Sequence, residues 1–188
     1  MKIKKVKIKL PEGEFGTDVI EYDNNDKNKI SETYKKWIEL CDNLSALFAR
    51  EVNLPEGLSE PVFCISMNTV RVVNSISGAN TSFDCYDLNR NKRIQVKACS
   101  VIPDLTSFGP KSEWDEIYFM DFYVDGKWDG TFHIYLIDNY SIYNHKVNSK
   151  QTLKEQQSQG KRPRFSIYTE IIKKNSLKPV FKGNVNTL

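Results

Sequence analysis

Four residues in one short stretch have the types and spacing to hold a metal ion beside a phosphate group. They are Asp84 and, ten intervening residues later, Gln95, Val96 and Lys97. A carboxylate, an amide oxygen and the backbone carbonyl of Val96 are hard oxygen ligands of the kind that Mg²⁺ binds. A phosphodiester hydrolase of this kind needs a set of oxygen ligands for the metal ion and an oriented water molecule. It also needs a positive charge that stabilises the transition state. The ammonium of Lys97 could contact both that water and the scissile phosphate.

A β-hairpin is predicted to bring these residues together. Apolar and polar residues alternate along 83–88 and 93–102, and a turn is expected between them. If the turn is centred on residues 90–91, Asp84 faces Lys97 and Tyr86 faces Gln95. Side chains alternate along a strand, so these four would project from one face. The side chains expected to pack on the opposite face are Cys85, Val96 and Ala98.

The same hairpin has a purely structural interpretation. Asp opposite Lys on paired strands is also an ordinary cross-strand ion pair. The surrounding pattern favours a site, because predicted helices precede the hairpin and a further strand follows it.

The spacing from Asp84 to Gln95-Val96-Lys97 resembles the PD-(D/E)xK signature of metal-dependent nucleases, a superfamily that includes most Type II restriction endonucleases. This resemblance covers residues 60–137. The blocks SGANTSFDCYD (77–87) and FGPKSEWDEIYF (108–119), with the short chain, resemble the small restriction endonuclease family that cuts the interrupted site GCNGC. The resemblance implies a Mg²⁺-dependent endodeoxyribonuclease that leaves 5′-phosphate and 3′-hydroxyl ends.

The chain departs from that signature at two positions. Phe83 stands where the pattern has Pro, which changes little because the aspartate carries the chemistry. Gln95 replaces the second acid, so metal affinity should be weaker unless another carboxylate joins the site. In many relatives a Glu from the preceding helical region does so, and Glu51 and Glu60 are the two candidates here.

Positive charge is concentrated near the C-terminal end. Residues 1–143 hold 17 Lys and Arg against 22 Asp and Glu, a net charge of −5, whereas residues 144–188 hold 10 against 2, a net charge of +8. Such a basic segment could bind a polyanion such as DNA, although a solvated lysine tail has the same composition. Arg and Gln can also bond to base edges. The residues expected to bind DNA are Lys146, Lys150, Lys154, Gln157, Lys161, Arg162 and Arg164, with the first three on one side of a helix.

The remaining elements indicate an α+β chain. A lysine-rich edge strand is predicted over 2–10, a loop over 12–28, and helices over 31–50 and 62–76. Strands at 83–88, 93–102, 116–124 and 131–137 are expected to form an antiparallel meander. The basic end should hold a short helix at 151–159 and a strand at 164–172. The resemblance adds a restriction-endonuclease-like core, a central mixed sheet whose catalytic antiparallel hairpin is flanked by helices.

Composition narrows the class of protein. The chain of 188 residues, 39% hydrophobic and 27% charged, predicts one nuclease domain over 1–188, with its basic DNA-recognition region at 140–188. It contains no apolar run of about 18 residues, no phosphate-binding GxxxxGK[ST] loop and no GxSxG nucleophile elbow. Its four cysteines form no CxxC pair, which indicates buried thiols in a reducing cytoplasm.

Together these observations predict a cytoplasmic Type II restriction endonuclease. It would act on double-stranded DNA as a homodimer, so that two sites cut two strands, with a cognate DNA methyltransferase as its genetic partner. Two alternatives remain open. They are a nucleic-acid-binding module without catalysis and a DNA repair nuclease of the same fold.

Overall fold

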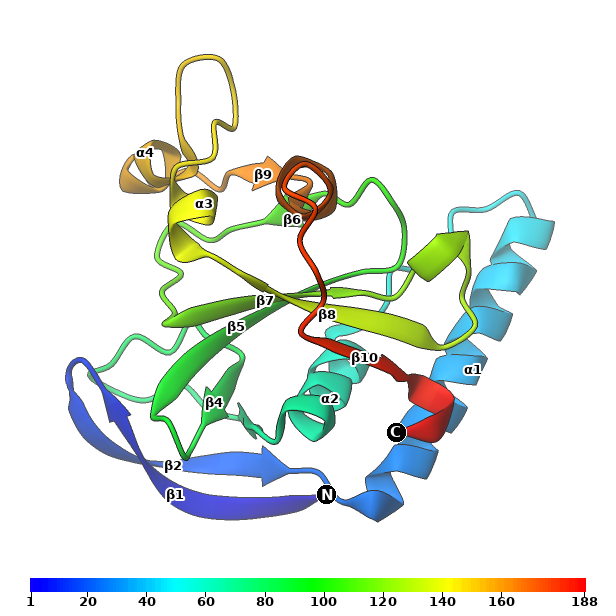
Figure 1. Ribbon diagram of the computed structural model, residues 1–188. Coiled ribbons are helices and arrows are strands. Elements are labelled where there is room, and N and C mark those ends of the chain that lie inside the picture. The colour runs from blue at the N-terminus through cyan, green and yellow to red at the C-terminus, as the bar shows by residue number, and fades with distance from the viewer.

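The computed structural model describes residues 1–188 and is built around one mixed sheet of eight strands (Figure 1). The strand order is β1-β2-β3-β4-β5-β7-β8-β10, and β6 and β9 form a separate pair above it. All neighbours in the large sheet are antiparallel except β5 and β7, which run parallel. This confirms the predicted α+β class with a mixed central sheet.

The strands are β1 (Lys2–Leu10), β2 (Gly13–Glu21), β3 (Val70–Val72), β4 (Cys85–Asp87), β5 (Lys92–Cys99), β6 (Thr106–Ser107), β7 (Glu116–Asp121), β8 (Thr131–Ile137), β9 (Arg164–Phe165) and β10 (Phe181–Asn184). The helices are α1 (Asn24–Ala46), α2 (Glu56–Met67), α3 (Asn139–Tyr143) and α4 (Leu153–Ser158), with short helical turns η1 (Val124–Gly126), η2 (Tyr168–Lys173) and η3 (Val185–Thr187). None of the helices has the length and apolar character that crossing a membrane would require.

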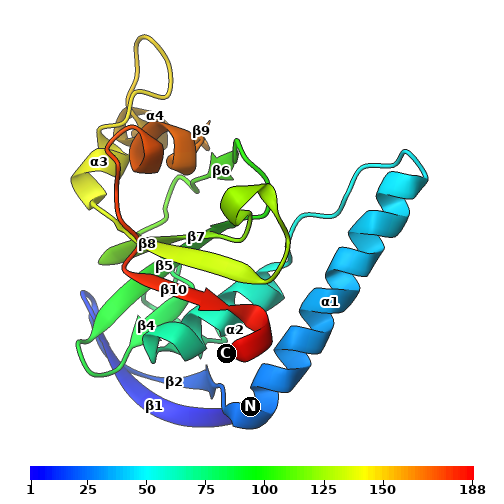
Figure 2. The ribbon, with the colours of Figure 1, turned by 45° about the vertical axis from the view of Figure 1, so that its right-hand side comes forward.

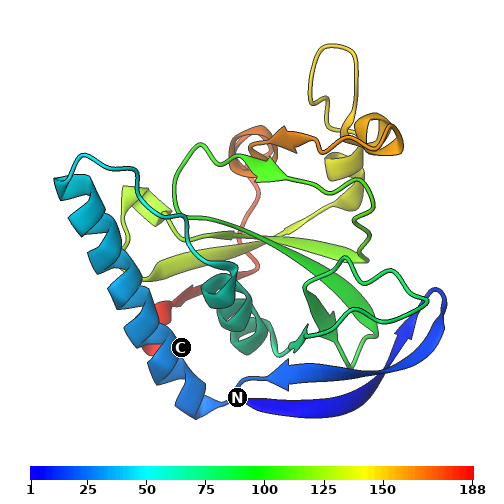
Figure 3. The ribbon, with the colours of Figure 1, turned by 180° about the vertical axis from the view of Figure 1, so that it is seen from behind.

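Two large apolar clusters lie on opposite faces of the sheet. Ile94 and Val96 of β5 belong to the first, together with α1 and α2. Ile117 and Phe119 of β7 belong to the second, together with the layer formed by β6, β9, α3, α4 and η2. After a turn of 45°, the far end of α1 stands clear of the body (Figure 2). Seen from behind, α2 lies against the sheet (Figure 3). β5 therefore runs through the middle of the molecule, with packing on both faces.

Helix α1 begins earlier and ends earlier than the sequence pattern predicted. Asp23 caps its N-terminus and forms a reciprocal capping box with Asp26, before the predicted start at residue 31. The helix ends at Ala46, so Phe48, which lies inside the predicted range 31–50, is outside the helix and fully exposed.

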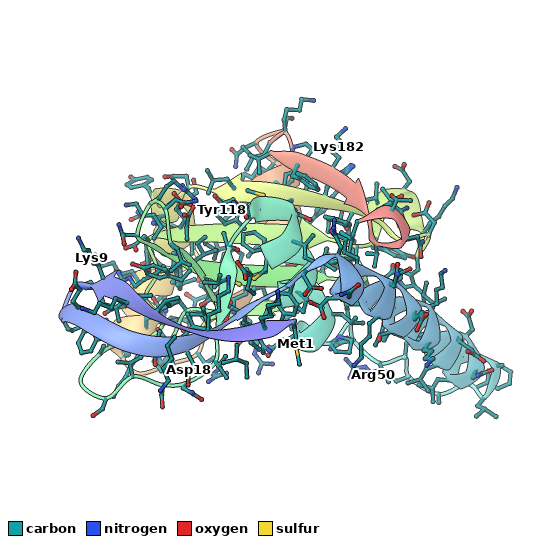
Figure 4. The ribbon with its side chains drawn as sticks, turned by 90° about the horizontal axis from the view of Figure 1, so that it is seen from below. Met1, Lys9, Asp18, Arg50, Tyr118 and Lys182 are labelled. Carbon is teal, nitrogen blue, oxygen red and sulfur yellow. The ribbon has the colours of Figure 1, made fainter.

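The predicted loop over residues 12–28 is wrong, because most of it is strand β2. β2 pairs with β1 along its whole length, and Lys9 lies at the outer end of this hairpin (Figure 4). Thr17 and Val19 are buried at alternate positions. The long-range burial of one face outweighs the weak strand preference of Gly13, Gly16 and Asp18. β1 forms one edge of the sheet, as predicted.

The second predicted helix, over 62–76, is shorter and lies earlier in the chain. α2 starts at Glu56, with Pro61 inside it, and ends at Asn68 in the left-handed conformation, φ 52°. Asparagine tolerates that conformation better than most residues, so it terminates the helix. Val70, Arg71 and Val72, which follow it, form β3.

The predicted antiparallel meander is right for the pairs β4–β5 and β7–β8 and wrong for β5–β7. β5 and β7 are parallel because residues 100–115 cross back over the sheet before β7 begins, so that Ile94 pairs with Glu116. This crossover carries β6 and Phe108 over the face of β5 that bears Gln95 and Lys97.

The C-terminal region forms short elements. α4 starts only at Leu153, so Lys146, Lys150 and Lys154 do not share one helix face. The strand expected over 164–172 is limited to β9, and the helical turn η2 follows it. All four cysteines are free and buried, as predicted.

Candidate active site

The β4–β5 hairpin presents Asp84, Gln95 and Lys97 on one face of the sheet. The turn occupies residues 88–91, and Cys85 pairs with Ile94. The N–H of Asp84 donates to the carbonyl of Ile94 at 3.0 Å. Asp84 therefore lies beside Gln95, two positions from Lys97, its predicted partner. A shift of two residues keeps every side chain on its own face, so the predicted grouping is retained.

The opposite face of the hairpin agrees with the prediction at two of three positions. Cys85 and Val96 are buried in the cluster beneath the sheet, whereas Ala98 is exposed. β4 starts at Cys85, so β5 has no partner on that side at Ala98, which pairs only with Met120 of β7.

A charged network fixes the turn of this hairpin. Asp87 accepts hydrogen bonds from the backbone N–H groups of Asn89 and Arg90, at 2.9 and 3.0 Å. The Arg90 guanidinium donates to Asp87 at 2.6 Å and bonds with both oxygens of Glu116, at 2.6 and 3.0 Å. Bidentate bonds of this kind are strong and directional. They fasten the turn to β7 and so set the register of Asp84.

Three of the proposed metal ligands meet at the Gln95 side chain. The Asp84 carboxylate accepts hydrogen bonds from the Val96 N–H, at 2.8 Å, and from the Gln95 amide. The same Gln95 nitrogen lies 3.5 Å from the carbonyl oxygen of Val96. An amide donor thus lies between two oxygen atoms that a cation could share.

Two desolvated carboxylates flank this position. Burial, opposed by Lys97 and by the Val96 N–H, raises the pKa of Asp84 to about 6. Burial and the negative charge of Asp84 raise the pKa of Glu60 to about 7. Each shift means that negative charge is poorly compensated here, and a bound cation would compensate it.

Of the two acids expected to complete the site, Glu60 is close to Asp84 and Glu51 is not. Glu60 lies on α2, is 7% exposed and bonds with the side chain of Arg71 on β3. Glu51 is exposed in the segment after α1, where it accepts a hydrogen bond from Ser45 at 2.8 Å. Glu56, one helical turn before Glu60, also contributes negative charge at Asp84.

Lys97 reaches the site from β5 beneath the crossover segment. It is half-buried, and its Nζ lies 6.0 Å from the centre of the Phe108 ring. Phe108 stacks on Phe165 of β9, with ring centres 5.3 Å apart. This aromatic pair connects the proposed catalytic lysine to the basic C-terminal region.

The donor set fits a hard divalent cation by its chemistry. No three His, Cys, Asp or Glu side chains cluster closely enough to hold a metal ion on their own. A metal would therefore need the two carboxylates of Asp84 and Glu60 with neutral oxygens from Gln95 and Val96. Oxygen ligands of this mixed kind suit Mg²⁺, although the amide of Gln95 must rotate to present its oxygen.

The residues expected to bind DNA differ in their availability. Six of the seven are exposed cations without an ion pair, namely Lys146, Lys150, Lys154, Lys161, Arg162 and Arg164. Gln157 is different, because its amide donates to the carbonyl of Gly109 at 2.6 Å. Arg164 lies on β9 and pairs in register with Ser107.

Sequence reasoning did not identify three residues around the site. Glu56 could have been found, because Glu56 and Glu60 are spaced to share one face of a helix. Arg71 and Phe108 gave no signal, since each reaches the site through strand pairing or a crossover that the sequence does not reveal.

Comparisons with known proteins identify a family for this chain. Residues 22–174 match the family model described as Bsp6I restriction endonuclease. The chain is 31% identical over 173 residues to the Type II restriction enzyme Bsp6I of Bacillus sp. (strain RFL6), covering 90% of this chain and 94% of that one. No solved structure matches it. The predicted resemblance to a restriction endonuclease family is confirmed: the chain belongs to the Bsp6I restriction endonuclease family.

Proposed function

We propose that this enzyme is a Type II restriction endonuclease that uses Mg²⁺ to hydrolyse phosphodiester bonds of double-stranded DNA at a specific sequence. The observation that carries the proposal is the convergence of Asp84, Gln95 and the Val96 carbonyl beside Lys97. The products would carry 5′-phosphate and 3′-hydroxyl ends, as in the nucleases that the chain resembles.

Each residue of the site has a distinct proposed role. Asp84, Gln95, Glu60 and the Val96 carbonyl would hold the cation. When bound, Mg²⁺ lowers the pKa of a water molecule and offsets negative charge on the phosphate. Lys97 donates hydrogen bonds to a phosphate oxygen and orients the attacking water.

The basic C-terminal region is the proposed DNA-binding surface. Its unpaired cations would contact phosphates, and Arg162 and Arg164 are candidates for base contacts. A homodimer would place two sites on the two strands of a near-palindrome, for which GCNGC is the proposed sequence. A DNA methyltransferase of the same specificity would protect the host genome in the cytoplasm.

Plasmid cleavage with and without Mg²⁺ tests this proposal. Discrete fragments are expected only with Mg²⁺. A smear of fragments would favour a repair nuclease, and intact plasmid with a gel shift would favour a binding module.

Asp84→Ala and Lys97→Ala should each abolish cleavage. DNA affinity should stay within about tenfold of wild type in gel-shift titrations, because positioning contacts lie elsewhere. Lys92→Ala, an exposed lysine of the same strand without an ion pair, is the matched control and should cut normally. Cleavage retained by either active-site variant would refute the assignment.

A further inference from the structure

Arg71 is the residue that neutralises Glu60 in the absence of a metal. Its Nε donates to Oε2 of Glu60 in a close ion pair. The side chain of Glu60 is 9% exposed and that of Arg71 is 35% exposed, so the pair lies at the boundary between core and solvent. A buried carboxylate without a partner would be strongly destabilising.

The position of Arg71 in the sheet places its charge beside the whole carboxylate group. β3 lies next to β4, and Arg71 pairs in register with Cys85, which follows Asp84. Its positive charge lowers the pKa of both Glu60 and Asp84, against burial, which raises them. Arg71 and a divalent cation therefore favour the same ionised carboxylates.

We propose that Arg71 is a positioning residue that competes with the divalent cation for the carboxylate of Glu60. This inference rests on the proposed function, in which Glu60 is a metal ligand. In the metal-free enzyme the guanidinium of Arg71 bonds with Glu60 and favours its ionised form. When the cation binds, Glu60 transfers from the guanidinium to the metal, and the partly exposed Arg71 side chain gains access to water.

Two features of the site support exchange over simultaneous binding. Glu60 has only two oxygens, and the Arg71 bond occupies one of them directly. A guanidinium and a divalent cation on the same small carboxylate would also repel each other at short range. A site in which a protein cation occupies a ligand in advance should bind free metal weakly.

Calorimetric titration with Mn²⁺ alone, without DNA, at pH 8.5, tests the competition. Arg71→Gln is expected to bind Mn²⁺ about tenfold more tightly than wild type. Arg71→Lys, which retains the charge, should stay within about threefold of wild type. Arg50→Gln removes the same charge from an exposed residue without an ion pair, beyond α1 (Figure 4), and should not change the affinity. An unchanged or weaker affinity in Arg71→Gln would overturn the proposal.

Two further measurements keep the test decisive if Arg71→Gln folds poorly. Glu60→Gln leaves Arg71 in place and should weaken Mn²⁺ binding at least tenfold; no weakening overturns the proposal. In the Glu60→Gln background, Arg71→Gln should give little further gain, because no carboxylate remains to be released. A full tenfold gain there would mean that Arg71 acts only as a distant charge, which also overturns it.

Measurements on the wild-type enzyme distinguish failure of the Arg71 competition from failure of the proposed function. If wild type binds Mn²⁺ and cuts plasmid while Arg71→Gln binds no more tightly, only the competition fails. If wild type neither binds Mn²⁺ nor cuts, the proposed function fails with it.

Discussion

Gln95 is the residue that distinguishes this site from one built on two acids. Its amide lies against Asp84 and near the Val96 carbonyl, where an acid would add negative charge. The charge of Asp84 already raises the pKa of Glu60, so a third carboxylate would be costly without a metal. The amide keeps an oxygen ligand while it lowers that repulsion.

Gln95→Glu should therefore keep or improve cleavage when Mg²⁺ is limiting, because a carboxylate binds the cation more strongly. The measurement is the cleavage rate over a Mg²⁺ titration, with a shift of the half-saturating concentration to lower values. Complete inactivation across the titration would argue that Gln95 is not a ligand.

The contribution of Asp84 to the stability of the metal-free protein is expected to be smaller at neutral pH than at pH 4. Its pKa, raised to about 6 mainly by burial, means that the folded state holds the proton more tightly than the unfolded state. That contribution is complete below the ordinary pKa of aspartate and is lost as the pH rises toward 6. Asp84→Asn should thus raise the free energy of unfolding by about 1–2 kcal/mol at pH 8, after allowance for partial exposure.

Asp87 is the matched control, since its pKa shifts in the opposite direction. Burial would raise the pKa of Asp87, but hydrogen bonds from the backbone and side chain of Arg90 outweigh burial and lower it. Asp87→Asn should cost about 1–2 kcal/mol at pH 8. Urea unfolding without metal measures both variants, and stabilisation by both or by neither would contradict this electrostatic account.

At the level of elements, the hairpin shows what the sequence could predict. The alternation of side chains alone placed Asp84, Gln95 and Lys97 on one face. Successive residues of a strand point to opposite faces, so a register shift by an even number of residues leaves each side chain on its face. The register was wrong by two residues, since it depends on how Asp87 and Arg90 close the turn. The predicted and observed registers differ by two residues, an even number, so the error in register did not change which side chains share a face.

The crossover between β5 and β7 contributes Phe108, which faces the ammonium of Lys97. A cation over an aromatic face is stabilised by about 0.5–2 kcal/mol. Phe108→Leu should reduce the single-turnover cleavage rate about threefold to tenfold without changing DNA affinity. Phe165→Leu removes an aromatic ring from the same stack but not from Lys97, and should have a smaller effect on the rate. Equal effects of the two variants would show that packing, and not the cation, matters.

Across the whole molecule, the sequence could not reveal which distant segments meet. Glu60 reaches Asp84 because α2 packs beneath β4, where Cys64 contacts Cys85. The two acids named beforehand, Glu51 and Glu60, were equally consistent with the sequence. The parallel pairing of β5 with β7 has the same origin, because it depends on the path of residues 100–115. Local periodicity contains no information about such contacts.

The charge asymmetry of the chain gives a prediction at this scale. Lys161 is exposed and has no ion pair, so Lys161→Ala should reduce the slope of log affinity against log salt by about 1. Fluorescence anisotropy with a DNA duplex over a salt series measures that slope. Lys35→Ala on α1 should leave the slope unchanged. The same slope in wild type and Lys161→Ala would show that Lys161 does not contact DNA phosphates and that the DNA-binding surface lies elsewhere.

The four buried thiols have a practical consequence. Cys41, Cys64 and Cys85 lie in the cluster beneath the sheet, and Cys99 lies in the cluster above it. A thiol reagent can reach any of them only when the surrounding layer opens. The rate of alkylation at each cysteine would therefore measure how often each of the two clusters opens, without any engineered label.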